Sequence, residues 1–138
     1  MSKKNIVIIG LGGVGGYFGF KINQSNEVTN ANKVTFVARG ASYDKIKQDG
    51  LTLLSPEHPI ATTRPDAILE DIQHIQNPDL ILICVKEYDL EAVCKQLINV
   101  INEDTVLLPL MNGADIYERI RYCRNYLSYK INDHWQRS

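Results

Sequence analysis

The sequence predicts an α/β protein, built as a mainly parallel, doubly wound sheet with helices on both faces. Three observations carry this prediction. An apolar run at 6–9 enters a cluster of glycines and is followed by a segment of helical periodicity. A second run, 80–85, is apolar without interruption, which is the pattern of a parallel strand buried on both faces. The segment after it places Leu90, Val93 and Leu97 on one helical stripe, so strand and helix patterns alternate along the chain.

The glycines after the first run have the spacing Gly10-x-Gly12-x-x-Gly15 between a predicted strand and a helix predicted over 13–25. This is the fingerprint of a dinucleotide-binding, Rossmann-type turn. The first glycine allows a tight turn, the second lets the backbone approach a pyrophosphate, and the third lets helix and strand pack closely. The predicted cofactor-binding residues of this turn are Gly10, Leu11, Gly12, Gly13, Val14 and Gly15. The alternative is a flexible glycine-rich loop that binds nothing.

The strand predicted over 33–38 ends at Arg39. NAD-binding domains usually carry Asp or Glu here, because a carboxylate accepts hydrogen bonds from the ribose 2′-hydroxyl. A guanidinium instead forms paired, charge-assisted hydrogen bonds with a 2′-phosphate. The sequence therefore predicts NADP(H) as the cofactor, with an ordinary solvated surface arginine as the alternative.

Two further polar residues follow predicted strands. Lys86 follows the strand 80–85, and Asn112 follows a strand predicted over 105–111. Ligands of open α/β sheets bind at the carboxyl ends of the strands, so both residues are candidates for contact with cofactor or substrate. The alternatives are a lysine that reaches water and an ordinary Asn-Gly turn. Pro109 lacks a backbone N–H, so the last strand is predicted to lie at a sheet edge or to be bulged.

The other predicted elements are shorter. The polar stretches 26–32 and 64–79 are predicted to be irregular. The remaining predictions are a helix over 42–49 capped by Ser42, short strands over 51–54 and 60–63, a helix continuing to Ile101, and a helix over 114–120.

Composition excludes several classes of function. The 138 residues, 44% hydrophobic, suffice for one domain with a core. A net charge of −1 argues against nucleic-acid binding, and no apolar stretch approaches the ~18 residues of a membrane helix. Cys84, Cys94 and Cys123 have no paired spacing, which indicates reduced thiols and a cytoplasmic location. The three histidines lack metal-ligand spacing, so no metal site is predicted.

With these residues in view, the chain resembles the ketopantoate reductase (2-dehydropantoate 2-reductase) family. The similar segments are IIGLGGVGGYFG, VARGASYDKIKQDGL, DLILICVKEYDL and LLPLMNGAD, which together span roughly residues 5–120. The resemblance implies an NADP-binding Rossmann domain over 1–120. The tail, 121–138, does not look like the family's continuation and is expected to be irregular.

The resemblance also implies a reaction and roles for residues. The family transfers a hydride from NADPH to the ketone of 2-dehydropantoate, giving pantoate for pantothenate and coenzyme A biosynthesis. By resemblance, Gly10, Gly12 and Gly15 hold the pyrophosphate and Arg39 holds the 2′-phosphate. Lys86 lies near the nicotinamide, and Asn112 lies beside cofactor and substrate, so these two are the predicted catalytic residues.

Family members continue into a helical C-terminal domain that carries a catalytic lysine and a substrate-binding glutamate. The sequence ends at Ser138, where that domain is absent, so we expect the chain to bind NADP(H) and to reduce a 2-keto acid weakly or not at all. The surface left uncovered favours a homo-oligomer. Two alternatives remain open, a related NADP-dependent 2-keto or 3-hydroxy acid dehydrogenase domain and a non-catalytic nucleotide-binding or interaction module.

Overall fold

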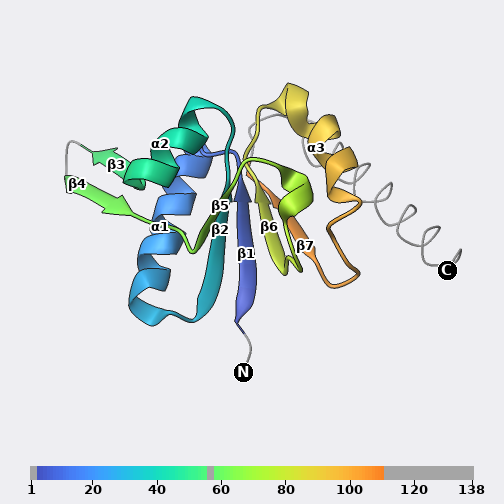
Figure 1. Ribbon diagram of the computed structural model, residues 1–138, viewed down its shortest axis with the longest axis horizontal. Helices are drawn as coiled ribbons and strands as arrows, with labels where there is room; N and C mark the ends of the chain where they lie inside the picture. The colour runs from blue at the N-terminus through green and yellow to red at the C-terminus, as the bar shows by residue number, and fades with distance from the viewer. Residues whose placement is uncertain (1–2, 56–57, 111–138) are drawn as a thin grey trace, which may run out of the picture.

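The computed structural model describes residues 3–55 and 58–110, which form a five-stranded sheet, a separate two-stranded hairpin and helices on both faces of the sheet (Figure 1). The elements in chain order, with η marking a 3-10 helix, are β1 (Lys4–Ile9), α1 (Gly13–Thr29), β2 (Asn32–Val37), α2 (Ala41–Asp49), β3 (Leu51–Ser55), β4 (His58–Thr63), β5 (Ala67–Leu69), η1 (Ile72–His74), β6 (Leu80–Ile83), η2 (Glu87–Asp89), α3 (Leu90–Leu97) and β7 (Val106–Pro109). The predicted doubly wound α/β fold is confirmed.

The main sheet has the strand order β5-β2-β1-β6-β7, and every pairing in it is parallel. Its register places Ile9 beside both Val37 and Ile83. The residues that follow therefore leave the sheet at one common edge. Two backbone hydrogen bonds close this edge, from the Gly10 N–H to the Val37 carbonyl (3.0 Å) and from the Cys84 N–H to the Ile9 carbonyl (2.8 Å).

Side chains of the central strand alternate between two hydrophobic cores, because successive residues of a strand point to opposite faces. Val7 and Ile9 pack with the apolar stripe of α3 on one face. Ile8 packs on the other face with β2 and with Ile46 of α2, and Ile22 of α1 lies against the same core. Figure 1 shows this division, with α1 and α2 on the left of the sheet and α3 on the right.

Helix α1 extends to Thr29, so the prediction that 26–32 forms a loop is wrong for 26–29, and the loop is confined to 30–31. Asn26 is buried although it is polar, because its side chain donates to the Asn32 carbonyl (2.7 Å) and accepts from the Asn32 N–H (2.9 Å). Asn30 ends the helix in the left-handed conformation, with φ of 50°. The polar residues here bind the entry of β2, a tertiary role that the local pattern does not reveal.

The segment 64–79, predicted to be irregular, contains the edge strand β5 and the short helix η1. β5 pairs with β2, and Ile72 and Ile75 are buried in the core that contains α3. The strand has only three residues, all half-buried, which is too short for a recognisable alternation. The prediction that Ser42 caps α2 is also wrong, because Gly40 is the N-cap and no side chain caps this helix.

The predicted hairpin is confirmed, since β3 and β4 pair antiparallel. β7 is the last strand in the order of the described part, which agrees with the expected edge position of Pro109. β6 ends at Ile83, two residues before the predicted end at Val85, and α3 ends at Leu97 rather than at Ile101. The predicted helix over 114–120 lies outside the described residues.

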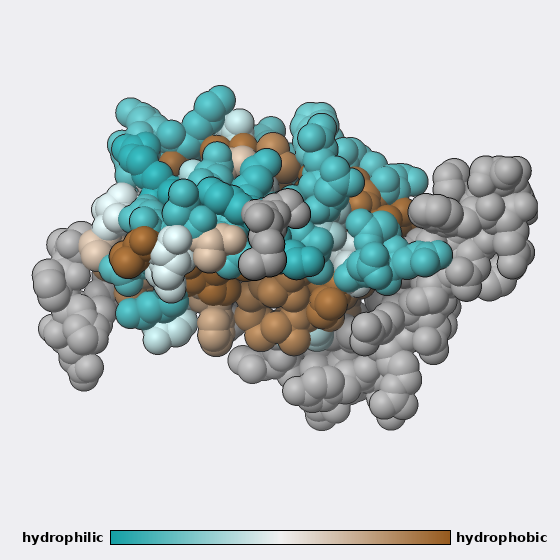
Figure 2. Space-filling view, turned by 90° about the horizontal axis from the view of Figure 1, so that it is seen from below, coloured by the Kyte–Doolittle hydropathy of each residue, from teal (hydrophilic) through white to brown (hydrophobic). Residues whose placement is uncertain are grey.

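Several large hydrophobic side chains of the described part are exposed. Val106 and Leu108 of β7 are 49% and 44% exposed, and they lie beside Leu80 and Leu82 on the same face of the sheet. Tyr17 and Phe18 of α1 are 50% and 40% exposed. Figure 2, seen from below, shows hydrophobic residues gathered in one area of the visible surface, next to a larger hydrophilic area. The sheet face at β7 is therefore less completely buried than the face against α3.

Candidate functional site

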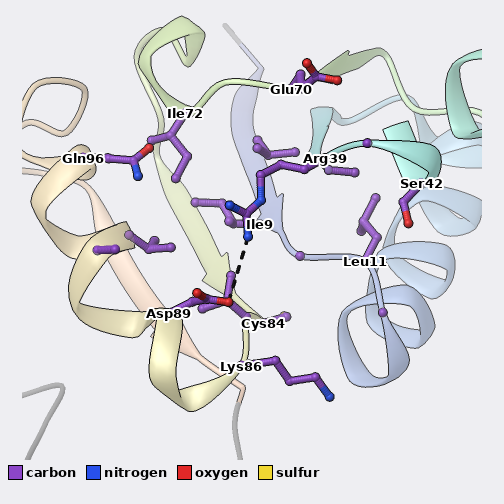
Figure 3. A pocket seen from close by; sticks show the side chains of 18 of the residues that line it. Ile9, Leu11, Arg39, Ser42, Glu70, Ile72, Cys84, Lys86, Asp89 and Gln96 are labelled. Atoms are coloured by element: carbon purple, nitrogen blue, oxygen red, sulfur yellow. Dashed lines mark ion pairs between the residues drawn. The ribbon is translucent and has the colours of Figure 1, made fainter. Parts of the chain in front are cut away.

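A pocket of about 1000 Å³ lies at the carboxyl edge of the main sheet. It lies where β1, β2 and β6 end and where η2 leads into α3 (Figure 3). The strand order reverses direction at this edge, since β1 is followed by β2 on one side and the chain later crosses to β6 on the other. Such a switch point is where open α/β sheets bind ligands.

The glycine turn forms one wall of the pocket. Gly10 has φ of 89°, a left-handed conformation that favours glycine, and a Cβ there would lie 2.8 Å from the Cys84 carbonyl oxygen. A Cβ on Gly15 would overlap the Gly10 carbonyl oxygen. Gly12 differs, because a Cβ there would meet no atom within 4 Å. Two glycines thus allow close packing of strand, turn and helix, while the third faces open space in the pocket.

Helix α1 begins at Gly13 and directs its N-terminus toward this space. Its N-cap, Gly12, has no side chain, and no acidic residue lies in the first turn. The unsatisfied N–H groups and the positive end of the helix dipole are therefore left for an external anion. A backbone that approaches a ligand closely and presents N–H groups suits a pyrophosphate. The residues present fit the phosphates of a dinucleotide.

Arg39 lies just beyond the end of β2 and lines the same pocket as the glycine turn (Figure 3). Its side chain is 78% exposed, and one guanidinium nitrogen lies 3.9 Å from a carboxylate oxygen of Asp89. Figure 3 shows this ion pair reaching from Arg39 to the start of α3. Exposed pairs of this kind contribute only ~0.2–1 kcal/mol. Arg39 is therefore free to bind a stronger anion.

Both signs of charge line the pocket. The cations are Arg39 and Lys86, and the carboxylates are Glu70, Asp71, Glu87 and Asp89. Sequence reasoning found the two cations and missed the four carboxylates. Glu70 and Asp71 follow β5, and the failure to recognise that strand hid their position at the carboxyl edge. Asp89 lies three residues after Lys86, and only its spatial position opposite Arg39 distinguishes it from other surface acids.

Cys84 lies between the glycine turn and Lys86 and lines the pocket. Burial raises the pKa of its thiol to about 11. The thiol is consequently neutral at physiological pH, and a neutral thiol is a poor nucleophile. Cys84 fills space under the glycine turn, and Cys94 lies buried in the core with α3.

The structure brings together six of the nine predicted site residues, which line the same pocket: Gly10, Leu11, Gly12, Gly13, Arg39 and Lys86. Gly15 lies buried behind the turn rather than on the pocket surface. Val14 lies in the first turn of α1. Asn112, predicted to contact cofactor and substrate, lies outside the described residues. Within the described ranges no three His, Cys, Asp or Glu side chains are placed to hold a metal ion, and no helix is long and apolar enough to cross a membrane.

Comparison with known proteins gives a consistent result. Residues 6–125 match the family model described as Ketopantoate reductase PanE/ApbA. The 2-dehydropantoate 2-reductase of Nostoc sp. (strain PCC 7120) is 26% identical over 120 residues, which are 87% of this chain and 35% of that protein. An uncharacterized oxidoreductase of Bacillus subtilis, YkpB, is 28% identical over 114 residues, or 83% of this chain and 35% of that protein.

Solved structures agree with these relatives. The 2-dehydropantoate 2-reductase of Porphyromonas gingivalis is 35% identical with a TM-score of 0.79, covering 87% of this chain and 42% of that chain. A D-mandelate dehydrogenase solved with NADH and anilino(oxo)acetate is 29% identical with a TM-score of 0.66, covering 83% and 36%. The chain spans about a third of the length of the curated relatives that it matches.

Proposed function

The chain belongs to the ketopantoate reductase (PanE/ApbA) family, and on this premise we propose that it is the nucleotide-binding part of an NADPH-dependent 2-dehydropantoate 2-reductase. The observation that carries the proposal is the position of Arg39 in the same pocket as the glycine turn. A nucleotide whose pyrophosphate lies at the N-terminus of α1 reaches the end of β2 with its adenosine ribose. Arg39 is the cation at that point.

In this proposal the chain's own residues bind and orient the nucleotide. The glycine turn and the N–H groups of α1 hold the pyrophosphate, and Arg39 binds the 2′-phosphate. Lys86 lines the pocket beyond the end of β6, where its positive charge favours an anionic cofactor or a 2-keto acid. We assign Lys86 and Asn112 to contact with the reacting groups. When bound, the nicotinamide cofactor supplies the hydride, and the protein supplies position and charge.

The whole protein would then act on a small 2-keto acid in the cytoplasm, in the pathway that leads from pantoate to pantothenate and coenzyme A. Association of two copies through a surface of this domain also belongs to the proposal, since the exposed Val106 and Leu108 form part of an apolar face.

A second candidate is an NADH-dependent 2-hydroxy acid dehydrogenase. It is favoured by the carboxylates that line the pocket near Arg39, among them Glu70, Asp71 and Asp89, because carboxylates accept hydrogen bonds from an unphosphorylated ribose. The relative solved with NADH, a D-mandelate dehydrogenase, points the same way. Cofactor preference separates the two candidates.

Calorimetric titration of this chain with NADPH and, separately, with NADH tests the proposal. We expect NADPH to bind at least ~10-fold more tightly, equivalent to ~1.4 kcal/mol. Arg39→Gln removes the charge while leaving an exposed polar side chain, so it should abolish this preference without weakening NADH binding. Equal affinity of the parent chain for both nucleotides would favour the second candidate, and binding of neither would contradict both.

A further inference from the structure

The ion pair between Arg39 and Asp89 links the two sides of the candidate nucleotide pocket. Arg39 follows β2, whereas Asp89 is the last residue of η2, and both line the pocket. We propose that Asp89 is a specificity-determining residue that opposes the 2′-phosphate of NADPH and so limits the preference of this site for NADPH over NADH. The inference rests on the proposed function, because it assumes that Arg39 is the group that meets the 2′-phosphate.

The Asp89 carboxylate has no part in capping its own helix. Asp89 is the N-cap of α3, a position where an aspartate side chain commonly accepts a hydrogen bond from the first helical turn. Here it makes no such bond, because η2 runs directly into α3 and Asp89 has helical backbone angles, φ −93° and ψ −8°. Its carboxylate is turned toward Arg39 instead, as Figure 3 shows. The charge is therefore available to the pocket.

The geometry of the pair means that a 2′-phosphate and the Asp89 carboxylate compete for the Arg39 guanidinium. The 3.9 Å separation exceeds hydrogen-bond distance, so the guanidinium has unused donors that a 2′-phosphate can take. A phosphate bound to that guanidinium then lies close to the Asp89 carboxylate. The guanidinium that binds the phosphate lies only 3.9 Å from the Asp89 carboxylate, well within the ~8 Å Debye length at physiological ionic strength. The negative charges of the phosphate and of the carboxylate therefore repel each other. The uncharged 2′-hydroxyl of NADH meets no such repulsion.

Asp89 also has a matched neighbour for comparison. Glu91 lies two residues further along in the first turn of α3 and is exposed, and it does not line the pocket. Both acids contribute the same interaction with the α3 dipole, so substituting either changes the charge at the start of the helix equally. Only Asp89 faces Arg39. A difference between the two substitutions therefore reports on the pocket.

The experiment measures the affinity of the parent chain, Asp89→Asn, Asp89→Glu and Glu91→Gln for NADPH and for NADH by calorimetry. Removing an exposed ion pair of ~0.2–1 kcal/mol corresponds to a change of up to about fivefold. We expect Asp89→Asn to bind NADPH about two- to fivefold more tightly than the parent chain and to leave NADH affinity unchanged. Asp89→Glu, which keeps the charge, and Glu91→Gln should retain the parent's ratio of NADPH to NADH affinity. The gain in Asp89→Asn should shrink as salt is raised, because the repulsion is screened.

Four results would overturn the inference, and they are distinguishable. If the parent chain binds NADPH and Asp89→Asn leaves the ratio unchanged, the inference fails while the proposed function stands. If Asp89→Asn weakens NADH, Asp89 is a hydrogen-bond acceptor for the ribose rather than an opponent of the phosphate. If the parent chain binds neither nucleotide, the inference falls together with the proposed function. A merely structural role for Asp89 would lower the unfolding temperature and shift both affinities together, which also contradicts the inference.

Discussion

Gly15→Ala and Gly12→Ala alter the same turn, yet the structure predicts opposite consequences for folding and for binding. A Cβ on Gly15 overlaps the Gly10 carbonyl oxygen and lies 2.8 Å from the Cys84 Cβ. One of these neighbours is backbone and the other is the first atom of a side chain, so neither moves without shifting β1 or β6. Overpacking usually costs ~1–3 kcal/mol, and the required backbone shift puts Gly15→Ala at about 3 kcal/mol or above.

Gly12→Ala makes no such contact, because nothing lies within 4 Å of the added methyl group and φ is −85°. Alanine is a poorer N-cap than glycine, but it also restricts the unfolded chain and so offsets part of this loss, and the net change in stability should stay below about 1 kcal/mol. The methyl group nevertheless occupies the space in which a pyrophosphate would contact the backbone. We expect NADPH affinity to fall at least 10-fold, or ~1.4 kcal/mol.

Urea unfolding followed by circular dichroism, together with calorimetric titration, separates the two effects. With a denaturant slope of ~1.5 kcal/mol/M, the loss in Gly15→Ala corresponds to a midpoint lowered by about 2 M. Gly12→Ala should unfold near the parent midpoint and bind poorly. The reasoning is refuted if both variants unfold alike, or if Gly12→Ala binds NADPH as tightly as the parent chain.

Three further predictions concern Cys84, Asn23 and Leu97. Burial raises the Cys84 pKa from its ordinary 9.0 to about 11, so folding favours the neutral thiol. The contribution of this thiol to the free energy of unfolding is fully present below pH 9 and declines as the pH rises through 11. Peptide mass spectrometry should therefore find Cys84 alkylated slowly at pH 8 in the folded chain, and alkylation at the rate of an unfolded control would contradict this. Asn23→Ala should cost ~2–3 kcal/mol in urea unfolding, because the buried Asn23 amide donates to the Thr63 hydroxyl and the Arg64 carbonyl at 2.7 Å each, whereas the exposed Gln24→Ala should change little. Leu97→Ala, at a fully buried position of α3, should cost ~2–5 kcal/mol by the same assay, and a loss no larger than that of the exposed Lys95→Ala would disprove its core role.

Prediction succeeded where a single segment carried the information. The run 6–9, the glycines after it and the helical pattern beyond specify strand, turn and helix through neighbouring residues alone. Arg39 and Lys86 could be placed at one edge because carboxyl ends of parallel strands meet there, and both line the pocket. Their roles toward a nucleotide stay predictions, as does that of Asn112.

Prediction failed where a residue's role depends on a contact that the local sequence pattern does not reveal. β5 is too short to show a period, and it is a strand because Ala67 pairs with Thr35 of β2. Asn26 belongs to a helix rather than a loop because it binds Asn32 across the turn.

The amino-acid sequence by itself thus determined the α/β class, the glycine turn and the two cations of the candidate site. Only the tertiary structure decided that Asp89 faces Arg39, that a Cβ would clash at Gly10 and Gly15 but not at Gly12, and that carboxylates share the pocket. The physical reason is the range of the interactions. Periodicity and turn chemistry act between neighbours along the chain, whereas ion pairing and steric exclusion act through space between segments that folding brings together.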